Sequence, residues 1–214
     1  HAGHAYHAGS DLELEYIAAR EAEILRDLAE RATALGVTVE EISVGSTPTS
    51  RFIDKQMGAP FAPTEMRPGN YVFFDRTQTG LGAATLDTCA MFIAATVVSR
   101  PAPDRVILDC GAKTLALDGA RGFGAMPGHG LVFLPDGAPD PSLLIERLSE
   151  EHATVKAPAS TRLKIGDRVR VLPNHSCVVT NLMDELVLVD GNTVTGRIRD
   201  VEDRERNVCW LPEG

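Results

Sequence analysis

The hydrophobic pattern of this chain changes near residue 80, and that change restricts the possible folds more than any other feature. Before it, the pattern indicates a helix (10–36), a strand (39–44), a short helix ending near Met57 and a second strand (71–75). After it, short β-branched runs alternate with turn signals. Alternating helices and strands are typical of parallel α/β structure, and closely spaced short strands are typical of antiparallel sheets. We therefore expect an α/β domain over residues 1–80 and a β-rich domain over residues 81–214.

The segment 10–36 carries the clearest helix signals. Ser10 and Glu13 have the spacing of a capping box, in which each side chain satisfies a backbone N–H of the first turn. Gly36 is placed to end the helix. Glu21 interrupts an apolar face that consists of Leu14, Ile17, Ala18, Leu25, Leu28, Ala32 and Leu35.

The second part of the chain contains several strand signals and one helix signal. Two apolar runs, 90–99 and 105–110, flank a Pro-rich turn. Alternation within 164–172 indicates another strand, and Asp190-Gly191-Asn192 is typical of a hairpin turn between strands at 186–189 and 193–198. Residues 143–151 are expected to form a short helix.

The composition argues against two classes of partner. The formal net charge is −9 and the basic residues are scattered, which argues against nucleic acid as a partner. No apolar run approaches the roughly 20 residues needed to span a membrane. The cysteines form no CxxC pair, so we expect free thiols in a reducing compartment, with the cytoplasm as the default location; they are Cys89, Cys110, Cys177 and Cys209.

The pair His175 and Cys177 is the first candidate site. On a strand, residues two apart point to the same face, so an imidazole and a thiolate would converge on one point. Both are good zinc ligands, and a site with two protein ligands leaves positions open for water or substrate. The spacing alone is also compatible with a partly buried histidine beside a small buried cysteine.

The run Gly45-Ser46-Thr47 is the second candidate site. It lies at a predicted strand-to-helix turn, where backbone N–H groups, two hydroxyls and a helix N-terminus form a natural cradle for phosphate. The alternative is an ordinary capped turn, which has the same local sequence.

Three further motifs could carry chemistry, although each has a simpler explanation. His1, His4 and His7 form a cluster near the N-terminus, where histidines usually bind nothing specific. The run 149–152 could supply an acid–base pair or could be the solvated end of a helix. Lys113 could be taken for a Schiff-base lysine, but it follows a short β run, which favours a surface or structural role.

Six blocks in order resemble the D-threonine aldolase and D-serine dehydratase family of pyridoxal-phosphate enzymes, which is related to alanine racemase. The blocks are GHAY at 3–6, SVGSTPT at 43–49, EMRPGNYVFFD at 65–75, LDCGAK at 108–113, SEEH at 149–152 and PNHSC at 173–177. The resemblance implies the C-terminal part of a (β/α)8 barrel over residues 1–80, followed by an antiparallel β-rich metal-binding domain. It also implies a homodimer in which the partner chain completes each active site.

The resemblance also implies site residues. His175 and Cys177 match the metal ligands of the family, and cysteine as the second ligand favours the dehydratase branch and Zn²⁺, with another divalent metal such as Mn²⁺ as the alternative. Pyridoxal 5'-phosphate is the implied cofactor, with Tyr71 expected on the next strand; the implied cofactor-binding residues are Ser43, Gly45, Ser46, Thr47 and Tyr71.

The sequence departs from the family at the catalytic lysine, which belongs to the first barrel strand. The lysines present are Lys55, Lys113, Lys156 and Lys164, and none lies in a matching context. We therefore assign no catalytic residue and expect this chain to be the C-terminal part of an enzyme, inactive alone because the lysine-bearing half is absent. For the intact enzyme we expect dehydration of a D-3-hydroxy amino acid of the D-serine type. The alternatives are retro-aldol cleavage to glycine and an aldehyde, and a binding module without catalysis.

Overall fold

The computed structural model describes residues 3–58 and 61–199, which divide into two compact units. Of the described residues, the first unit contains those up to residue 91 and 120–127, and the second contains 92–119 and 128–199. The chain therefore passes from the first unit to the second between Met91 and Phe92. It returns to the first unit over residues 120–127. The domain boundary expected near residue 80 stays a prediction. Across the described ranges, no helix is both long and apolar enough to cross a membrane.

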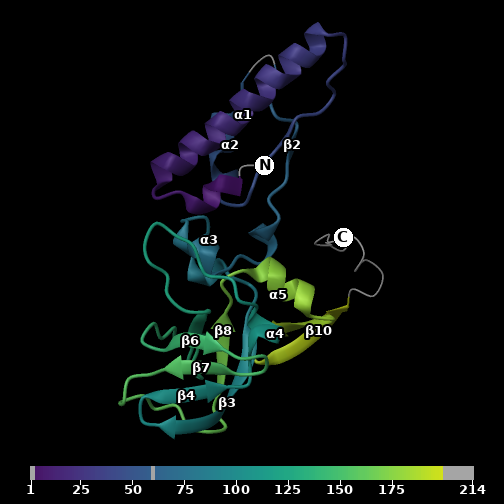
Figure 1. Ribbon diagram of the computed structural model, residues 1–214. Coiled ribbons are helices and arrows are strands. Elements are labelled where there is room, and N and C mark those ends of the chain that lie inside the picture. Colours follow the sequence, from purple (N-terminus) through teal and green to yellow (C-terminus); the bar gives the residue numbers. More distant parts are fainter. Residues whose placement is uncertain (1–2, 59–60, 200–214) are drawn as a thin grey trace. The chain divides into compact units, whose positions relative to one another are not determined.

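The first unit is built around one long helix and a short parallel strand pair (Figure 1). Strand β1 pairs with β2 in parallel, Ser43 opposite Glu65 and Val44 opposite Met66, so the unit has a helix–strand–helix–strand order in which β2 takes the place of the strand expected at 71–75. The elements are η1 Gly3–His7, α1 Asp11–Ala34, β1 Ser43–Val44, η2 Ser50–Phe52, α2 Ile53–Gln56, β2 Glu65–Met66, η3 Asn70–Val72, α3 Arg76–Gly80 and η4 Leu86–Thr88.

Helix α1 begins and ends as its sequence predicts. The Ser10 hydroxyl accepts the Glu13 N–H at 3.2 Å, and the Glu13 carboxylate accepts the Gly9 N–H at 2.8 Å. The helix ends at Ala34, and Gly36 follows with φ of +84°. The predicted apolar face was wrong at its C-terminal end, because Leu28 and Leu35 are exposed; the buried residues are Leu14, Ile17, Ala18, Glu21, Ala22 and Ala29.

The strand expected at 71–75 does not form. Residues 70–72 make the single 3₁₀ turn η3, and Phe74 has a φ of +52°, which turns the chain out of an extended path. Asp75 then caps α3, because its carboxylate accepts the Gln78 N–H at 2.9 Å. The second strand of this unit lies earlier, at Glu65–Met66.

The second unit is an antiparallel sheet of six strands in the order β5-β8-β3-β4-β7-β6. A separate hairpin of β9 and β10 follows, with its turn at 191–192 as predicted. The elements are β3 Ile93–Ala102, β4 Arg105–Leu108, α4 Ala112–Leu115, β5 Leu131–Phe133, β6 Leu144–Leu148, β7 Ala153–Lys156, β8 Arg168–Leu172, α5 Ser176–Leu182, β9 Glu185–Asp190 and β10 Thr193–Arg199.

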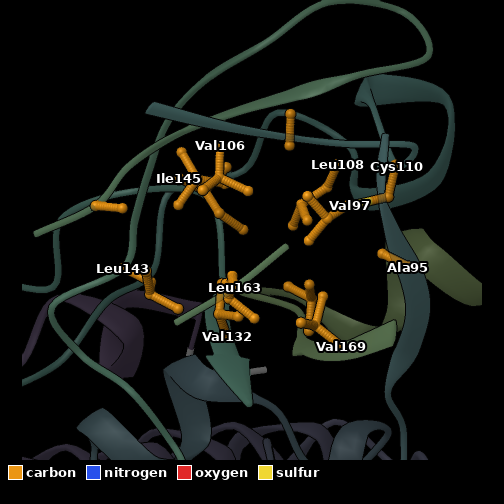
Figure 2. Packing of buried hydrophobic residues seen from close by; sticks show 14 of the residues in the cluster. Ala95, Val97, Val106, Leu108, Cys110, Val132, Leu143, Ile145, Leu163 and Val169 are labelled. Carbon is orange, nitrogen blue, oxygen red and sulfur yellow. The ribbon is translucent and has the colours of Figure 1, made fainter. Parts of the chain in front are cut away.

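The sheet curls around one apolar core. Figure 2 shows Val97, Leu108, Val106 and Ile145 pointing into a shared interior, and all four side chains are at most 1% exposed. The helix expected at 143–151 is instead strand β6, which pairs with β7 and places Ile145 in this core. Burying such side chains contributes about 1.5–3 kcal/mol each, so tertiary packing decides the conformation of this short segment.

Candidate functional site

The candidate metal ligands lie at the start of a helix, in contrast to the strand that the sequence analysis assumed. Strand β8 ends at Leu172, His175 is the N-cap residue of α5, and Cys177 lies in the first turn of that helix. Because the two residues do not lie on a strand, the convergence of their side chains expected from strand alternation does not follow. His175 has an extended backbone, with φ of −146°, as is usual for an N-cap residue.

An acidic side chain that the sequence analysis missed lies beside the imidazole. The Nδ1 atom of His175 lies 3.2 Å from Oδ2 of Asp118, and both side chains are partly exposed, at 42% and 47%. Because 57 residues separate the two, no local pattern in the sequence could have paired them.

The neighbour of His175 fixes the backbone on both sides of this contact. Asn174 is 2% exposed, and its Nδ2 atom donates to the carbonyl oxygens of Asp118 at 2.9 Å and Gly128 at 2.8 Å. The residue directly before the imidazole thus holds the backbone of the residue that carries the carboxylate. Such buried polar contacts give a unit a single local arrangement.

The donor set suits a two-ligand metal site. Within the described residues, no group of three His, Cys, Asp or Glu side chains is arranged to hold a metal ion. A metal site at His175 and Cys177 would draw two ligands from the described residues and leave positions open for water or substrate, and it stays a prediction.

The three cysteines in the described residues differ in chemical environment. Burial raises the pKa of the Cys110 thiol to about 12, with a smaller contribution from Asp109, and raises that of Cys89 to about 11. Cys177 is only half-buried, and all three are free thiols as expected. Cys209 lies outside the described residues.

Thiol alkylation at pH 8 is expected to separate these cysteines. A pKa near 11 in place of an ordinary 9.0 lowers the thiolate fraction of Cys89 about a hundredfold. We expect iodoacetamide to label Cys177 at least about tenfold faster than Cys89 or Cys110, as mapped by peptide mass spectrometry. The same reaction in 8 M urea is the control, which should equalise the rates. Labelling of Cys110 as fast as Cys177 in the folded protein would contradict this assignment.

The candidate phosphate loop follows β1 and is more enclosed than expected. Ser46 and Thr47 are 2% and 1% exposed. The Gly45 N–H donates to the Glu21 carboxylate at 3.2 Å, and the Ser46 N–H donates to Oγ1 of Thr49 at 3.2 Å. Two of the N–H groups expected for phosphate therefore already have protein acceptors.

Thr47 is the loop residue that best keeps donors for an anion. Its Oγ1 accepts the Asn70 N–H at 2.9 Å, which leaves the hydroxyl hydrogen to be donated. The Ser43 hydroxyl, by contrast, bonds the Glu65 carboxylate. Tyr71 lies in η3 rather than on a strand, and its side chain is 46% exposed.

Glu21 supports this loop from helix α1, which explains why a carboxylate interrupts an apolar face. It is 8% exposed; one oxygen accepts the Gly45 N–H, and the other accepts Nε2 of Gln56 at 3.1 Å. The role of Glu21 could not be predicted from the sequence, because its partners lie 24 and 35 residues away.

The remaining motifs have structural partners. His4 and His7 lie in η1, where the His7 ring contacts Arg121, and His1 lies outside the described residues. Residues 149–152 form the turn between β6 and β7. Lys113 pairs with Glu150 and Glu151 at 2.8 Å each and is 60% exposed. The ion pairs of Lys113 favour its surface role, whereas the helix end expected at 149–152 was wrong, because this run connects two strands.

The chain matches known proteins over most of its length. The model of the putative serine dehydratase domain matches residues 90–189. D-serine dehydratase of Dictyostelium discoideum is 27% identical over 90% of this chain and 50% of its own length. D-threo-3-hydroxyaspartate dehydratase of Delftia sp. is 31% identical over 83% of this chain and 48% of its own length. D-threonine aldolase of Arthrobacter sp. is 32% identical over 83% of this chain and 41% of its own length. The chain thus spans about half the length of these relatives and matches their C-terminal part.

Solved structures confirm the expected fold class. The Delftia enzyme superposes with a TM-score of 0.77 and 29% identity, covering 87% of this chain and 51% of that one. A histidine-to-alanine mutant and a cysteine-to-alanine mutant of it are also solved, the latter in the metal-free form. An alanine racemase-like protein of Idiomarina loihiensis has a TM-score of 0.82 at 24% identity, over 98% of this chain and 55% of that one. The fold is that of the C-terminal portion of alanine racemase-like proteins.

Proposed function

Because the chain belongs to the family of D-serine dehydratases and D-threonine aldolases, we propose that it is the C-terminal part of a lyase acting on D-3-hydroxy amino acids. The favoured reaction is dehydration of the D-serine type. The substrate loses its Cα proton and its 3-hydroxyl as water, and hydrolysis of the resulting enamine then gives a 2-keto acid and ammonia. We further propose a cytoplasmic homodimer.

The observation that carries this proposal is the donor pair at the start of α5. Asp118 occupies the Nδ1 side of His175, so Nε2 is the ring nitrogen left to act as a ligand, and the Cys177 thiol two residues later is the second candidate donor. An imidazole nitrogen and a thiolate favour zinc over harder cations such as Mn²⁺. A metal bound there would act as a Lewis acid toward the 3-hydroxyl of the substrate. Cysteine at the second ligand position favours the dehydratase over the aldolase.

The cofactor would be pyridoxal 5'-phosphate, held by Ser43, Gly45, Ser46, Thr47 and Tyr71. It supplies an electron sink for the carbanion at Cα. The loop offers fewer N–H donors to the phosphate than expected, because the N–H groups of Gly45 and Ser46 already donate to Glu21 and Thr49. Thr47 would bind the phosphate through its hydroxyl hydrogen, and Glu21 would hold the loop from behind. Tyr71 is exposed enough to contact a ligand.

Product analysis tests the proposed reaction. A gene product that contains residues 1–214 together with the lysine-bearing half is incubated with D-serine, D-threo-3-hydroxyaspartate or D-threonine. We expect ammonia and a 2-keto acid, loss of the reaction in EDTA, and its return with zinc. Cys177→Ala should lower the zinc content, and Cys89→Ala is the matched control. Glycine and an aldehyde would instead establish the aldolase, and the absence of any product together with unchanged zinc in Cys177→Ala would favour a binding module.

A further inference from the structure

The contact between His175 and Asp118 determines which ring nitrogen can bind a metal. A carboxylate only accepts hydrogen bonds, so at 3.2 Å the Nδ1 atom is the one that carries hydrogen and donates. In the neutral ring the lone pair then lies on Nε2. The geometry therefore selects one tautomer of His175 and one direction for ligation.

Two features of the backbone place Asp118 where it makes this contact. Ala116 ends helix α4 with φ of +57° and ψ of −170°, a conformation that costs a residue with a Cβ roughly 1–3 kcal/mol. Two residues later, the carbonyl oxygen of Asp118 accepts from the buried amide of Asn174. The strained residue two positions earlier and the hydrogen bond to the carbonyl of Asp118 itself thus hold the backbone that carries an exposed carboxylate.

Asp118 is not a third ligand in this arrangement. No cluster of three His, Cys, Asp or Glu side chains suitable for a metal occurs in the described ranges, although Asp118 lies within hydrogen-bonding distance of His175. Its carboxylate meets the nitrogen opposite the one that would ligate. Metal-binding histidines usually donate their second ring N–H to such a partner, which fixes the ring and raises its basicity.

We propose that Asp118 is a positioning residue for the metal site: it accepts the Nδ1–H of His175 and so presents Nε2, with the Cys177 thiolate, to a divalent metal ion. This inference rests on the metal site of the proposed function and adds a residue to it. A purely structural role is the competing explanation. An exposed pair of this kind contributes only about 0–1 kcal/mol to stability. A purely structural role therefore predicts unchanged metal affinity when Asp118 is replaced, whereas the positioning role predicts weaker metal binding.

Zinc affinity measured by competition with a chelating dye tests the proposal on the whole chain. We expect Asp118→Ala to bind zinc about 10–100-fold more weakly than wild type. Asp118→Asn should lie between them, because an amide oxygen still accepts from Nδ1–H but lacks the charge. At saturating cobalt, both variants should keep the thiolate-to-cobalt absorption band, because Cys177 remains a ligand. Asp136→Asn is the matched control, since Asp136 is another exposed aspartate of the same unit and should leave affinity unchanged.

The outcomes separate this inference from the proposed function. If wild type binds zinc and Cys177→Ser loses the cobalt band, but both Asp118 variants bind zinc as tightly as wild type, the positioning role is wrong and the metal site stands. An equal loss of affinity in Asp136→Asn would show a general charge effect and would also overturn the positioning role. If wild type binds no zinc, or if His175→Ala and Cys177→Ser bind it normally, the metal site itself is wrong.

Discussion

Replacing Gly111 by alanine is expected to destabilise the protein by about 3 kcal/mol, because the added methyl group meets backbone rather than side chains. A Cβ at this position would lie 2.3 Å from the carbonyl oxygen of Glu150 and 2.5 Å from the nitrogen of Glu151. The Ala112 N–H also donates to the carbonyl oxygen of Ser149 at 2.8 Å. The start of α4 and the turn at 149–152 therefore cannot move apart without losing a hydrogen bond. The φ of Gly111 is −110°, so the expected effect is steric and owes nothing to conformational freedom.

Gly119→Ala is the matched control for this substitution. No atom lies within 4 Å of a Cβ at Gly119, apart from its immediate chain neighbours, so the same methyl group enters open space. Urea denaturation followed by circular dichroism would give the free energy of unfolding of each variant. A Gly111→Ala variant within about 0.5 kcal/mol of Gly119→Ala would contradict the close approach between α4 and the turn at 149–152.

Local signals in the sequence predicted the elements that local interactions stabilise. Ser10 and Glu13 marked the start of α1, and Asp190-Gly191-Asn192 marked the β9–β10 turn, because caps and tight turns involve residues within four positions of one another. The apolar runs at 90–99 and 105–110 became β3 and β4 for a similar reason, since they pair across a short turn. These elements owe little to distant parts of the chain.

The wrong predictions concern residues whose conformation depends on distant contacts. Residues 143–151 have an ambiguous short pattern, and pairing with β7 makes them a strand. At 71–75 the apolar run suggested a strand, but Phe74 takes a positive φ and Asp75 caps a helix. His175 was placed on a strand, although β8 ends three residues before it.

The candidate site was only partly visible in the sequence for the same reason. The donor types at His175 and Cys177 and the Gly45 turn could be identified locally. Their supporting residues could not, because Glu21 contacts Gly45 across 24 residues and Asp118 contacts His175 across 57. Supporting contacts of this length appear only once the chain is folded.

Asn174→Asp is expected to be the second substitution with a large effect, destabilising the protein by about 3–5 kcal/mol at neutral pH. The Asn174 amide is 2% exposed and donates to two carbonyl oxygens, those of Asp118 and Gly128. An aspartate there replaces both donors by a carboxylate that faces the same oxygens. Two partly buried carbonyl groups then lose this partner, and the charge at the buried position 174 faces carbonyl oxygens rather than a cation.

The pH dependence of this variant distinguishes charge from lost packing. Protonation of the new carboxyl removes the buried charge, so the difference in unfolding free energy between wild type and Asn174→Asp should narrow as the pH falls from 7 to 5. Asn192→Asp makes the same chemical change in the exposed turn between β9 and β10 and should stay within about 0.5 kcal/mol of wild type. If the loss in unfolding free energy of Asn174→Asp did not change with pH, the shape of the side chain at this position would matter more than its charge. A deficit no larger than that of Asn192→Asp would mean that the Asn174 amide does not hold the Asp118 and Gly128 segments together, and the positioning of Asp118 would lose its structural support.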